Sequence, residues 1–293
     1  MYLSRLENTK YEFIKSMVIE PKKEDFKMGN SNTTDHREVF DSQRKIVAHM
    51  TSKSWKKVPH VSYIYQPDIT DFYAEYRKIA GKDRITINTI MLKVIAEGLL
   101  SAPTLNAHLE YNDETKKGQL QYKKDINISI PWQMPNGTMF PLAIHKVNEL
   151  SLTEIAESIA RLGEKVEKTD LTELVGMLVK ETPSSTTNGG LTVEDIKGGT
   201  VTVSNVGSLY KEQKGHFSLL EIIPPEVFVV GIGAIQEIAG VYSDENGSKQ
   251  IGIRKVLPMT LVFDHRAVDF SALVPFLKKL DEIFAFPSVI NKW

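Results

Sequence analysis

The chain has 293 residues, of which 41% are hydrophobic and 25% charged, and these proportions are ordinary for a soluble globular protein. Its formal net charge is -1, so the composition gives no electrostatic reason to expect binding to nucleic acid or to an anionic membrane. The sequence contains no cysteine, which excludes disulfide bonds, thiolate metal sites and a cysteine nucleophile.

The N-terminal segment is polar and differs from the rest of the chain. Its opening, "MYLSRLENTKYEFIKSM", has no apolar core ahead of a small-residue cleavage site, so we do not expect a secretory signal. No run of about 18 apolar residues occurs, so we predict no membrane span and a cytoplasmic protein. We interpret residues 1–38 as an N-terminal arm or lead-in and residues 39–293 as one folded domain.

The first half of this domain reads as a mixture of helices and strands. A helical pattern begins at Asp41, and a second helix follows Asp68 as its cap. A third helix is expected to stop before Pro103. The predicted elements, in chain order, are a helix from 41, a strand at 60–66, a helix carrying Phe72, Tyr73 and Tyr76, a helix at 86–100, and a hairpin of 105–111 with 118–124.

The second half is richer in strands. Ser151 and Glu154 form a capping box before a helix at 152–168. We expect Asn246-Gly247 to join the central strand 225–235 to the next strand in a tight hairpin. The other predicted elements are a strand at 127–132, a turn at 135–137, a loop at 182–190, strands at 198–207 and 256–263, and a final helix with Leu273, Val274, Leu277, Leu280 and Phe284 on one stripe.

The strands after residue 190 do not alternate regularly with helices, as they would in a doubly wound fold. We therefore predict an α+β fold, a two-layer sandwich in which helices cover one side of a mixed β-sheet. Pro275 belongs in the first turn of a helix, so we expect the final helix to begin later than Asp269 suggests.

Several weak signals do not support a site. "GIGAIQ" (231–236) has glutamine at the third glycine position and is followed by a hairpin, which disfavours a dinucleotide site. Six of the seven histidines have no partner at metal-ligand spacing, and these are His36, His49, His60, His108, His145 and His216. We therefore predict no metal site and regard these histidines as surface or core residues.

The segment "VFDHRAVDF" (262–270) places four ionisable side chains at the end of an apolar strand. Burying charge is costly unless the charge is paired or used, so the segment is either a structural ion cluster or a reaction centre. His265 suits general-base chemistry because its ordinary pKa lies near neutrality. Asp269, four residues later, could anchor the loop through an arginine. The spacing alone favours neither interpretation decisively.

A second segment, "GGTVTVSNVGS" (198–208), places Ser204 at a strand end in a glycine-framed turn. A hydroxyl there could donate a hydrogen bond to a developing oxyanion. An ordinary turn serine would fit the same pattern.

Taken together, these segments resemble the catalytic domain of the dihydrolipoyl acyltransferases of 2-oxoacid dehydrogenase complexes, whose fold is also that of the chloramphenicol acetyltransferases. The resemblance spans roughly residues 38–285. The blocks that carry it, in order, are "RKIVAHMTSKSWKKVPHVSYIYQPDITD", "PTLNAHL", "NISIPWQMPNGTMFPLAIHKVNELSLTEI", "GGTVTVSNVG", "PPEVFVVGIGAI" and "LPMTLVFDHRAVD".

The resemblance implies thioester exchange between coenzyme A and a dihydrolipoyl thiol, without a metal. His265 matches the family's general base and Ser204 the hydroxyl that stabilises the oxyanion. Asp269 matches the aspartate that holds the loop, with Arg44 or Arg266 as structural support. The resemblance further implies a homotrimer, or a larger assembly of trimers, with Ser204 and His265 facing each other from different subunits.

Three departures leave alternatives open. Phe270 stands where the family motif has glycine, and it either strains the backbone or fills part of a substrate pocket. The chain shows neither a lipoyl domain with its Asp-Lys-Ala hairpin nor a subunit-binding segment with an Ala/Pro-rich linker, so we expect a catalytic domain that uses a lipoyl group on a separate carrier. The alternatives are an O- or N-acyltransferase of a small molecule that uses acyl-CoA, and a non-catalytic trimeric scaffold.

Overall fold

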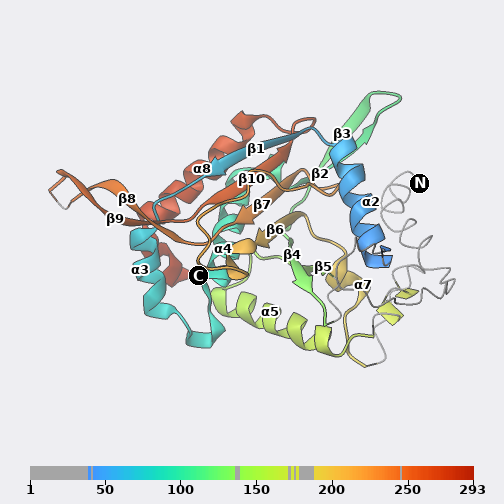
Figure 1. Cartoon of the computed structure of the whole chain (residues 1–293), viewed down its shortest axis with the longest axis horizontal. Coiled ribbons are helices and arrows are strands. Elements are labelled where there is room, and N and C mark those ends of the chain that lie inside the picture. Colours follow the sequence, from blue (N-terminus) through green and yellow to red (C-terminus); the bar gives the residue numbers. More distant parts are fainter. Residues whose placement is uncertain are drawn as a thin grey trace, which may run out of the picture.

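A six-stranded mixed β-sheet organises the fold (Figure 1). The computed structural model describes residues 39–40, 42–135, 139–170, 173–174, 176–177, 188–244 and 246–293. The predicted arm at 1–38 lies outside the described residues, as do most of the loop 182–190 and part of the turn 135–137. No helix within the described ranges is long and apolar enough to cross a bilayer.

The strand order in the sheet is β1-β10-β7-β6-β4-β5. The β7–β6 and β6–β4 pairs are parallel and the other three pairs are antiparallel, so the sheet is mixed as predicted. The strands of this sheet are β1 (His60–Tyr65), β4 (Ile128–Gln133), β5 (Met139–Ile144), β6 (Val201–Asn205), β7 (Phe228–Ile232) and β10 (Met259–Asp264). Two antiparallel hairpins stand beside it, β2 (Ala107–Asn112) with β3 (Lys117–Tyr122) and β8 (Gln236–Ser243) with β9 (Lys249–Val256).

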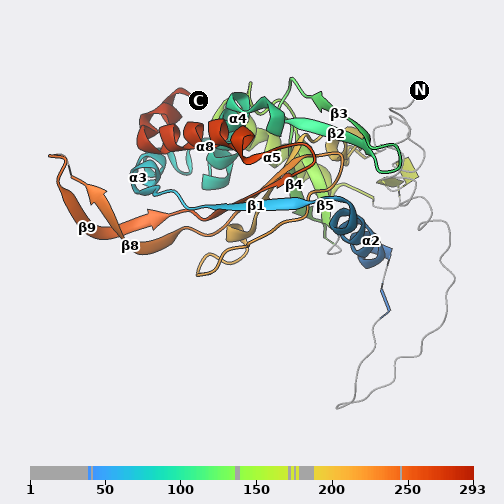
Figure 2. The same cartoon turned by 90° about the horizontal axis from the view of Figure 1, so that it is seen from above.

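Helices form the second layer and lie mainly on one side of the sheet, as Figure 2 shows for α3, α4 and α8. The α-helices are α2 (Ser42–Lys57), α3 (Thr70–Ile79), α4 (Ile87–Ser101), α5 (Leu152–Glu167), α7 (Val193–Ile196) and α8 (Phe270–Ala285). Short 3-10 helices are η1 (Lys82–Arg84), η2 (Pro103–Leu105), η3 (Val206–Ser208) and η4 (Pro287–Lys292). The α+β two-layer sandwich is thus confirmed.

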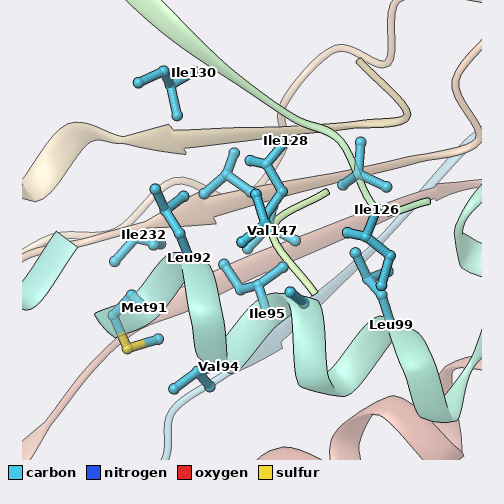
Figure 3. Close-up of a cluster of buried hydrophobic side chains, with 14 of the residues drawn as sticks. Met91, Leu92, Val94, Ile95, Leu99, Ile126, Ile128, Ile130, Val147 and Ile232 are labelled. Carbon is cyan, nitrogen blue, oxygen red and sulfur yellow. The ribbon is translucent and has the colours of Figure 1, made fainter. Parts of the chain in front are cut away.

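The main core lies between this helical layer and the sheet. Leu92, Ile95 and Leu99 of α4 are fully buried against the sheet and the strand-flanking residues Ile126 and Val147 (Figure 3). Because side chains alternate between the two faces of a strand, only every second residue of β7 and β10 reaches this core. The opposite face, which we call the open face, carries the other half.

Local signals in the sequence explain most element boundaries. The capping box of Ser151 and Glu154 begins α5, with the Ser151 hydroxyl accepting from the Glu154 amide. Thr86 caps α4, which ends at Ser101, just before Pro103. The hairpin β2–β3 and the fully buried strand β7 also agree with their predictions.

The predicted partner of β7 is wrong. The turn at Asn246-Gly247 joins β8 to β9, in a separate sheet, while the neighbours of β7 are β10 and β6. The chain leaves the main sheet after Ile232, where the Gly233 amide turns to the carbonyl of Pro258 at 2.8 Å. A strand pattern that runs through this bend cannot show it.

The start of the last helix also differs from expectation. α8 begins at Phe270, so Pro275 lies inside the helix instead of in its first turn. Proline has no amide to donate to the carbonyl of Ser271 four residues earlier. Both Ser271 and Pro275 are exposed, so water can hydrate that carbonyl and the break is tolerated.

Gly98 allows α4 and α8 to approach closely. A Cβ at this position would lie 2.6 Å from Leu280 Cδ1 and 2.7 Å from the ring of Phe276. We predict that Gly98→Ala lowers the free energy of unfolding by about 1–3 kcal/mol through overpacking. Gly163→Ala in α5 is the matched control, since its nearest neighbour, Trp132, is 3.5 Å away, and it should be neutral or stabilising by up to about 1 kcal/mol.

Urea denaturation followed by circular dichroism measures both variants. Equal effects of the two substitutions would contradict the close helix approach at Gly98.

Candidate active site

The turn that follows β10 carries His265. The amides of Ala267 and Val268 donate to the carbonyl of Asp264 at 2.9 and 3.0 Å. The His265 amide donates to the carbonyl of Pro59, immediately before β1, at 3.0 Å. These bonds fix the backbone on both sides, while the imidazole itself is 49% exposed and accessible to a substrate.

Asp269 lies beside this imidazole. Its Oδ1 is 3.3 Å from Nδ1 of His265. Asp269 occupies the N-cap position of α8, yet its side chain makes no capping hydrogen bond, although aspartate ordinarily caps a helix there. The carboxylate faces the ring instead. A negative charge beside Nδ1 favours the tautomer protonated at Nδ1, which leaves Nε2 as the proton acceptor.

Asp264 forms the buried part of the charged segment. Its side chain is 1% exposed, and Arg266 binds it through Nε to Oδ1 at 3.0 Å and Nη2 to Oδ2 at 2.7 Å. The Arg266 amide adds a third bond to Oδ1 at 3.0 Å. The structure therefore pairs Arg266 with Asp264, a residue to which the sequence analysis assigned no role. Side chains alternate along a strand, so Asp264 points to the same face as Val262, which is buried. This spacing was the signal in the sequence that Asp264 would be buried.

Ser204 lies far from His265 within one chain. Ser204 of β6 is in register with Gly231 of β7, which is in register with Thr260 of β10. His265 follows Thr260 by five residues along the chain. The two side chains are therefore separated by roughly 16 Å along the strands and roughly 10 Å across them. A single chain does not bring the two predicted catalytic residues together.

Phe270 and Arg44 are the remaining predicted residues. Phe270 is the first residue of α8 and is not among the described non-glycine residues with positive φ, so it carries no left-handed strain. Its ring is half-exposed and lies 5.3 Å, centroid to centroid, from the ring of Tyr63 on β1. Arg44 is exposed in the first turn of α2. A link between Arg44 and Asp269 stays a prediction, as does a substrate pocket at Phe270.

We predict that Asp264→Ala destabilises the chain by about 2–4 kcal/mol, because the partly buried Arg266 loses its partner. Asp125→Ala is the matched control, since Asp125 pairs with Lys146 at 3.8 Å on the surface and should cost less than about 1 kcal/mol. Urea denaturation compares the two. Similar small losses would show that the Asp264–Arg266 pair does not hold the turn.

The chain is similar to a known protein family and to solved structures. The family described as 2-oxoacid dehydrogenases acyltransferase (catalytic domain) matches residues 32–177 and 175–291. The dihydrolipoyllysine-residue acetyltransferase component of the pyruvate dehydrogenase complex of Mycobacterium bovis is 26% identical over 232 residues. This alignment covers 77% of this chain but only 37% of that protein.

Two solved structures share the fold. One is the cubic core of the pyruvate dehydrogenase multienzyme complex, and the other is the dihydrolipoamide acetyltransferase of Azotobacter vinelandii, studied for the roles of a serine, a histidine and an asparagine in its catalytic mechanism. Each is 22% identical with a TM-score of 0.64, covering 90% of this chain and 100% of the other. The family match extends over most of the length of this chain. The chain therefore belongs to the family of 2-oxoacid dehydrogenase acyltransferase catalytic domains.

Proposed function

We propose that this chain transfers an acyl group between coenzyme A and a thiol of the dihydrolipoyl type. The observation that carries the proposal is the exposed imidazole of His265, fixed at its backbone and faced by Asp269 at 3.3 Å. Membership of an acyltransferase family gives this geometry a reaction. Residues 39–293 are the proposed catalytic domain, and a cytoplasmic location remains a prediction from the sequence.

The reaction needs one base and one oxyanion donor. Nε2 of His265 takes the proton of the acceptor thiol, and the thiolate attacks the carbonyl carbon of the acyl thioester. The hydroxyl of Ser204 donates a hydrogen bond to the oxyanion that forms. Collapse of this intermediate breaks the original carbon–sulfur bond, and the departing thiolate recovers the proton from His265.

The separation of Ser204 from His265 requires a second copy of the chain. Ser204 lies on the open face and His265 in the exposed turn after β10, so a neighbouring copy that packs at this end of the sheet can present its Ser204 to the His265 of the first. We propose a homotrimer closed in this way, because a three-fold ring satisfies the same contact at every subunit. The cubic core with which the chain shares its fold supports assembly from repeated units.

The hairpin of β8 and β9 offers further surface for this assembly. It projects away from the body of the molecule in both views (Figures 1 and 2). Val241 and Ile251 are in register on it, and Ile253 is two residues along the same face. All three are exposed. Apolar side chains gathered on a projecting hairpin favour burial against another subunit.

The Azotobacter vinelandii enzyme supports the assignment of roles. Its studied histidine and asparagine are four residues apart, as are His265 and Asp269 here. Asparagine and aspartate both offer an oxygen acceptor to a histidine Nδ1–H. The proposed roles of Ser204, His265 and Asp269 follow this pattern.

We predict that His265→Ala lowers kcat about 100- to 10,000-fold with the fold intact, because the base is lost. The assay follows thiol release from a panel of acyl-CoA donors with dihydrolipoamide as acceptor. His145→Ala, which removes an exposed histidine beyond β5 at the opposite edge of the sheet, is the control and should retain activity. Near-normal turnover of His265→Ala would make His265 a structural residue and remove the mechanism.

The shared site predicts complementation between inactive variants. Chains carrying Ser204→Ala and chains carrying His265→Ala are mixed in equal amounts, unfolded together and refolded. In randomly assembled rings, about one quarter of the sites would combine an intact Ser204 with an intact His265. Activity should therefore recover to about one quarter of the wild-type level, although each parent is nearly inactive.

Each parent refolded alone is the control for this recovery. If both residues of a site come from one chain, every site keeps one defect and mixing restores nothing. A monomeric chain in light scattering would also contradict the shared site.

A further inference from the structure

A strap of residues 217–222 crosses the open face of the sheet. The carbonyl of Phe217 accepts a hydrogen bond from Thr260 Oγ1 on β10. The carbonyl of Ser218 accepts one from Ser62 Oγ on β1. The strap is thus attached through its backbone to two adjacent strands.

The strap also packs over the middle of the sheet. A Cβ at Gly231 would lie 2.5 Å from Leu220 Cδ1, so the missing side chain at this position lets Leu220 pack against β7. Gly231 is in register with Ser204, so Leu220 of the strap lies at the level of the proposed oxyanion donor. Ile222 of the strap also forms a small apolar cluster with Val58, Val229 and Val262.

His60 holds the other end of the strap. Its Nε2 accepts from the Ile222 amide at 3.0 Å, and Ser54 Oγ donates to the carbonyl of the same residue. The ring also makes a hydrogen bond to the Val58 backbone and stacks on Trp55, with centroids 6.0 Å apart. An imidazole that accepts at one nitrogen and donates to a carbonyl at the other is neutral. From the sequence, His60 was interpreted as a core or surface residue with no partner at metal-ligand spacing.

The turn that carries the proposed base, His265, lies beside His60. Pro59, next to His60, accepts the His265 amide. His60 is also in register with Asp264, the buried carboxylate paired with Arg266. His60 therefore contacts the strap through its side chain, and its chain neighbour Pro59 bonds to the turn that carries His265.

From these contacts we propose that His60 is a positioning residue: in its neutral form it pins the strap at Ile222 and so holds the strap in place between the level of Ser204 on the sheet and the turn that carries His265. Protonation of Nε2 removes the acceptor for the Ile222 amide and loosens the strap at this residue. The part of this proposal that concerns catalysis rests on the proposed acyl transfer, while the pinning itself does not.

The surroundings of His60 set the direction of its titration. Burial lowers the pKa of His60 below its usual value, and Arg266 acts in the same direction. The Val58 backbone, Asp264 and Glu221 oppose this. The folded state therefore binds fewer protons than the unfolded chain between the two pKa values. The stabilisation by neutral His60 is complete above about pH 6.5 and is lost as the pH falls through the lower, folded-state pKa.

Two variants separate the contribution of the His60 hydrogen bond from that of the bulk of its ring. His60→Gln keeps an acceptor near the position of Nε2 but does not titrate. His60→Leu keeps the bulk and removes the acceptor. We expect His60→Leu to lower kcat about 10- to 100-fold through loss of position, with a smaller change in KM. We expect His60→Gln to rescue most of that loss at pH 7.5.

Hydrogen exchange of the Ile222 amide measures the pin directly, after correction for the intrinsic pH dependence of exchange. In the wild type, protection should be constant above about pH 6.5 and should fall about tenfold for each pH unit below the folded-state pKa of His60. It should be independent of pH in His60→Gln and low throughout in His60→Leu. Residues 228–232 of β7 serve as the internal control. The fluorescence difference between the wild type and Trp55→Phe gives the pKa of His60, because a protonated imidazole quenches a stacked indole.

The outcomes distinguish this proposal from the proposed function. Wild-type protection of Ile222 in His60→Leu, or pH-dependent protection in His60→Gln equal to that of the wild type, overturns the pin. A normal kcat in His60→Leu with an exposed Ile222 amide overturns the positioning role. An active His265→Ala enzyme overturns the acyl-transfer mechanism and leaves the exchange result standing.

Discussion

The ion pair of Asp264 and Arg266 is the interaction on which the candidate site depends. It ends a buried strand with a carboxylate that would be strongly destabilising without a partner. The partner is only two residues away, in the turn that follows β10, where the amide of Arg266 binds the same carboxylate. In this turn His265 is exposed, and Asp269, at the N-cap of α8, faces the imidazole. The charged segment therefore combines a structural ion pair with a candidate base, and the two interpretations apply to different residues.

The alternation of side chains along the central strands separates stability from function. Val230, Leu261 and Phe263 point into the large core under the helices, which supplies most of the apolar burial. Their neighbours face the open side, where Thr260 and Ser62 bond to the strap through hydroxyls. Ser204 belongs to this second face through its register with Gly231. One sheet thus carries the large core on one face, and Ser204 and the bonds to the strap on the other.

Elements that depend on neighbouring residues are predicted correctly from the sequence. Features that depend on contacts between distant residues are not. The capping box at Ser151 and the apolar run of β7 depend on neighbouring residues, and both were predicted correctly. The path of the chain after Ile232 depends on Pro258, which lies far along the sequence, and the hairpin at Asn246-Gly247 was misplaced for that reason. The same limit applies to His60. Its contact with Ile222 spans 162 positions, and no periodicity in the sequence reports it.

The distance between Ser204 and His265 has a consequence for how activity depends on assembly. The gap is set by the length of core strands, so side-chain rotation cannot close it. Under the proposed function, each isolated chain holds two half-sites, and contact with another copy completes them. Activity then follows the fraction of assembled chains and is linked to protein concentration by mass action. The strap extends from the level of Ser204, where Leu220 packs on Gly231, to the level of Asp264, where Ile222 contacts His60. A residue that holds the strap, such as His60, therefore influences both the shape of the site and the surface on which the site is completed.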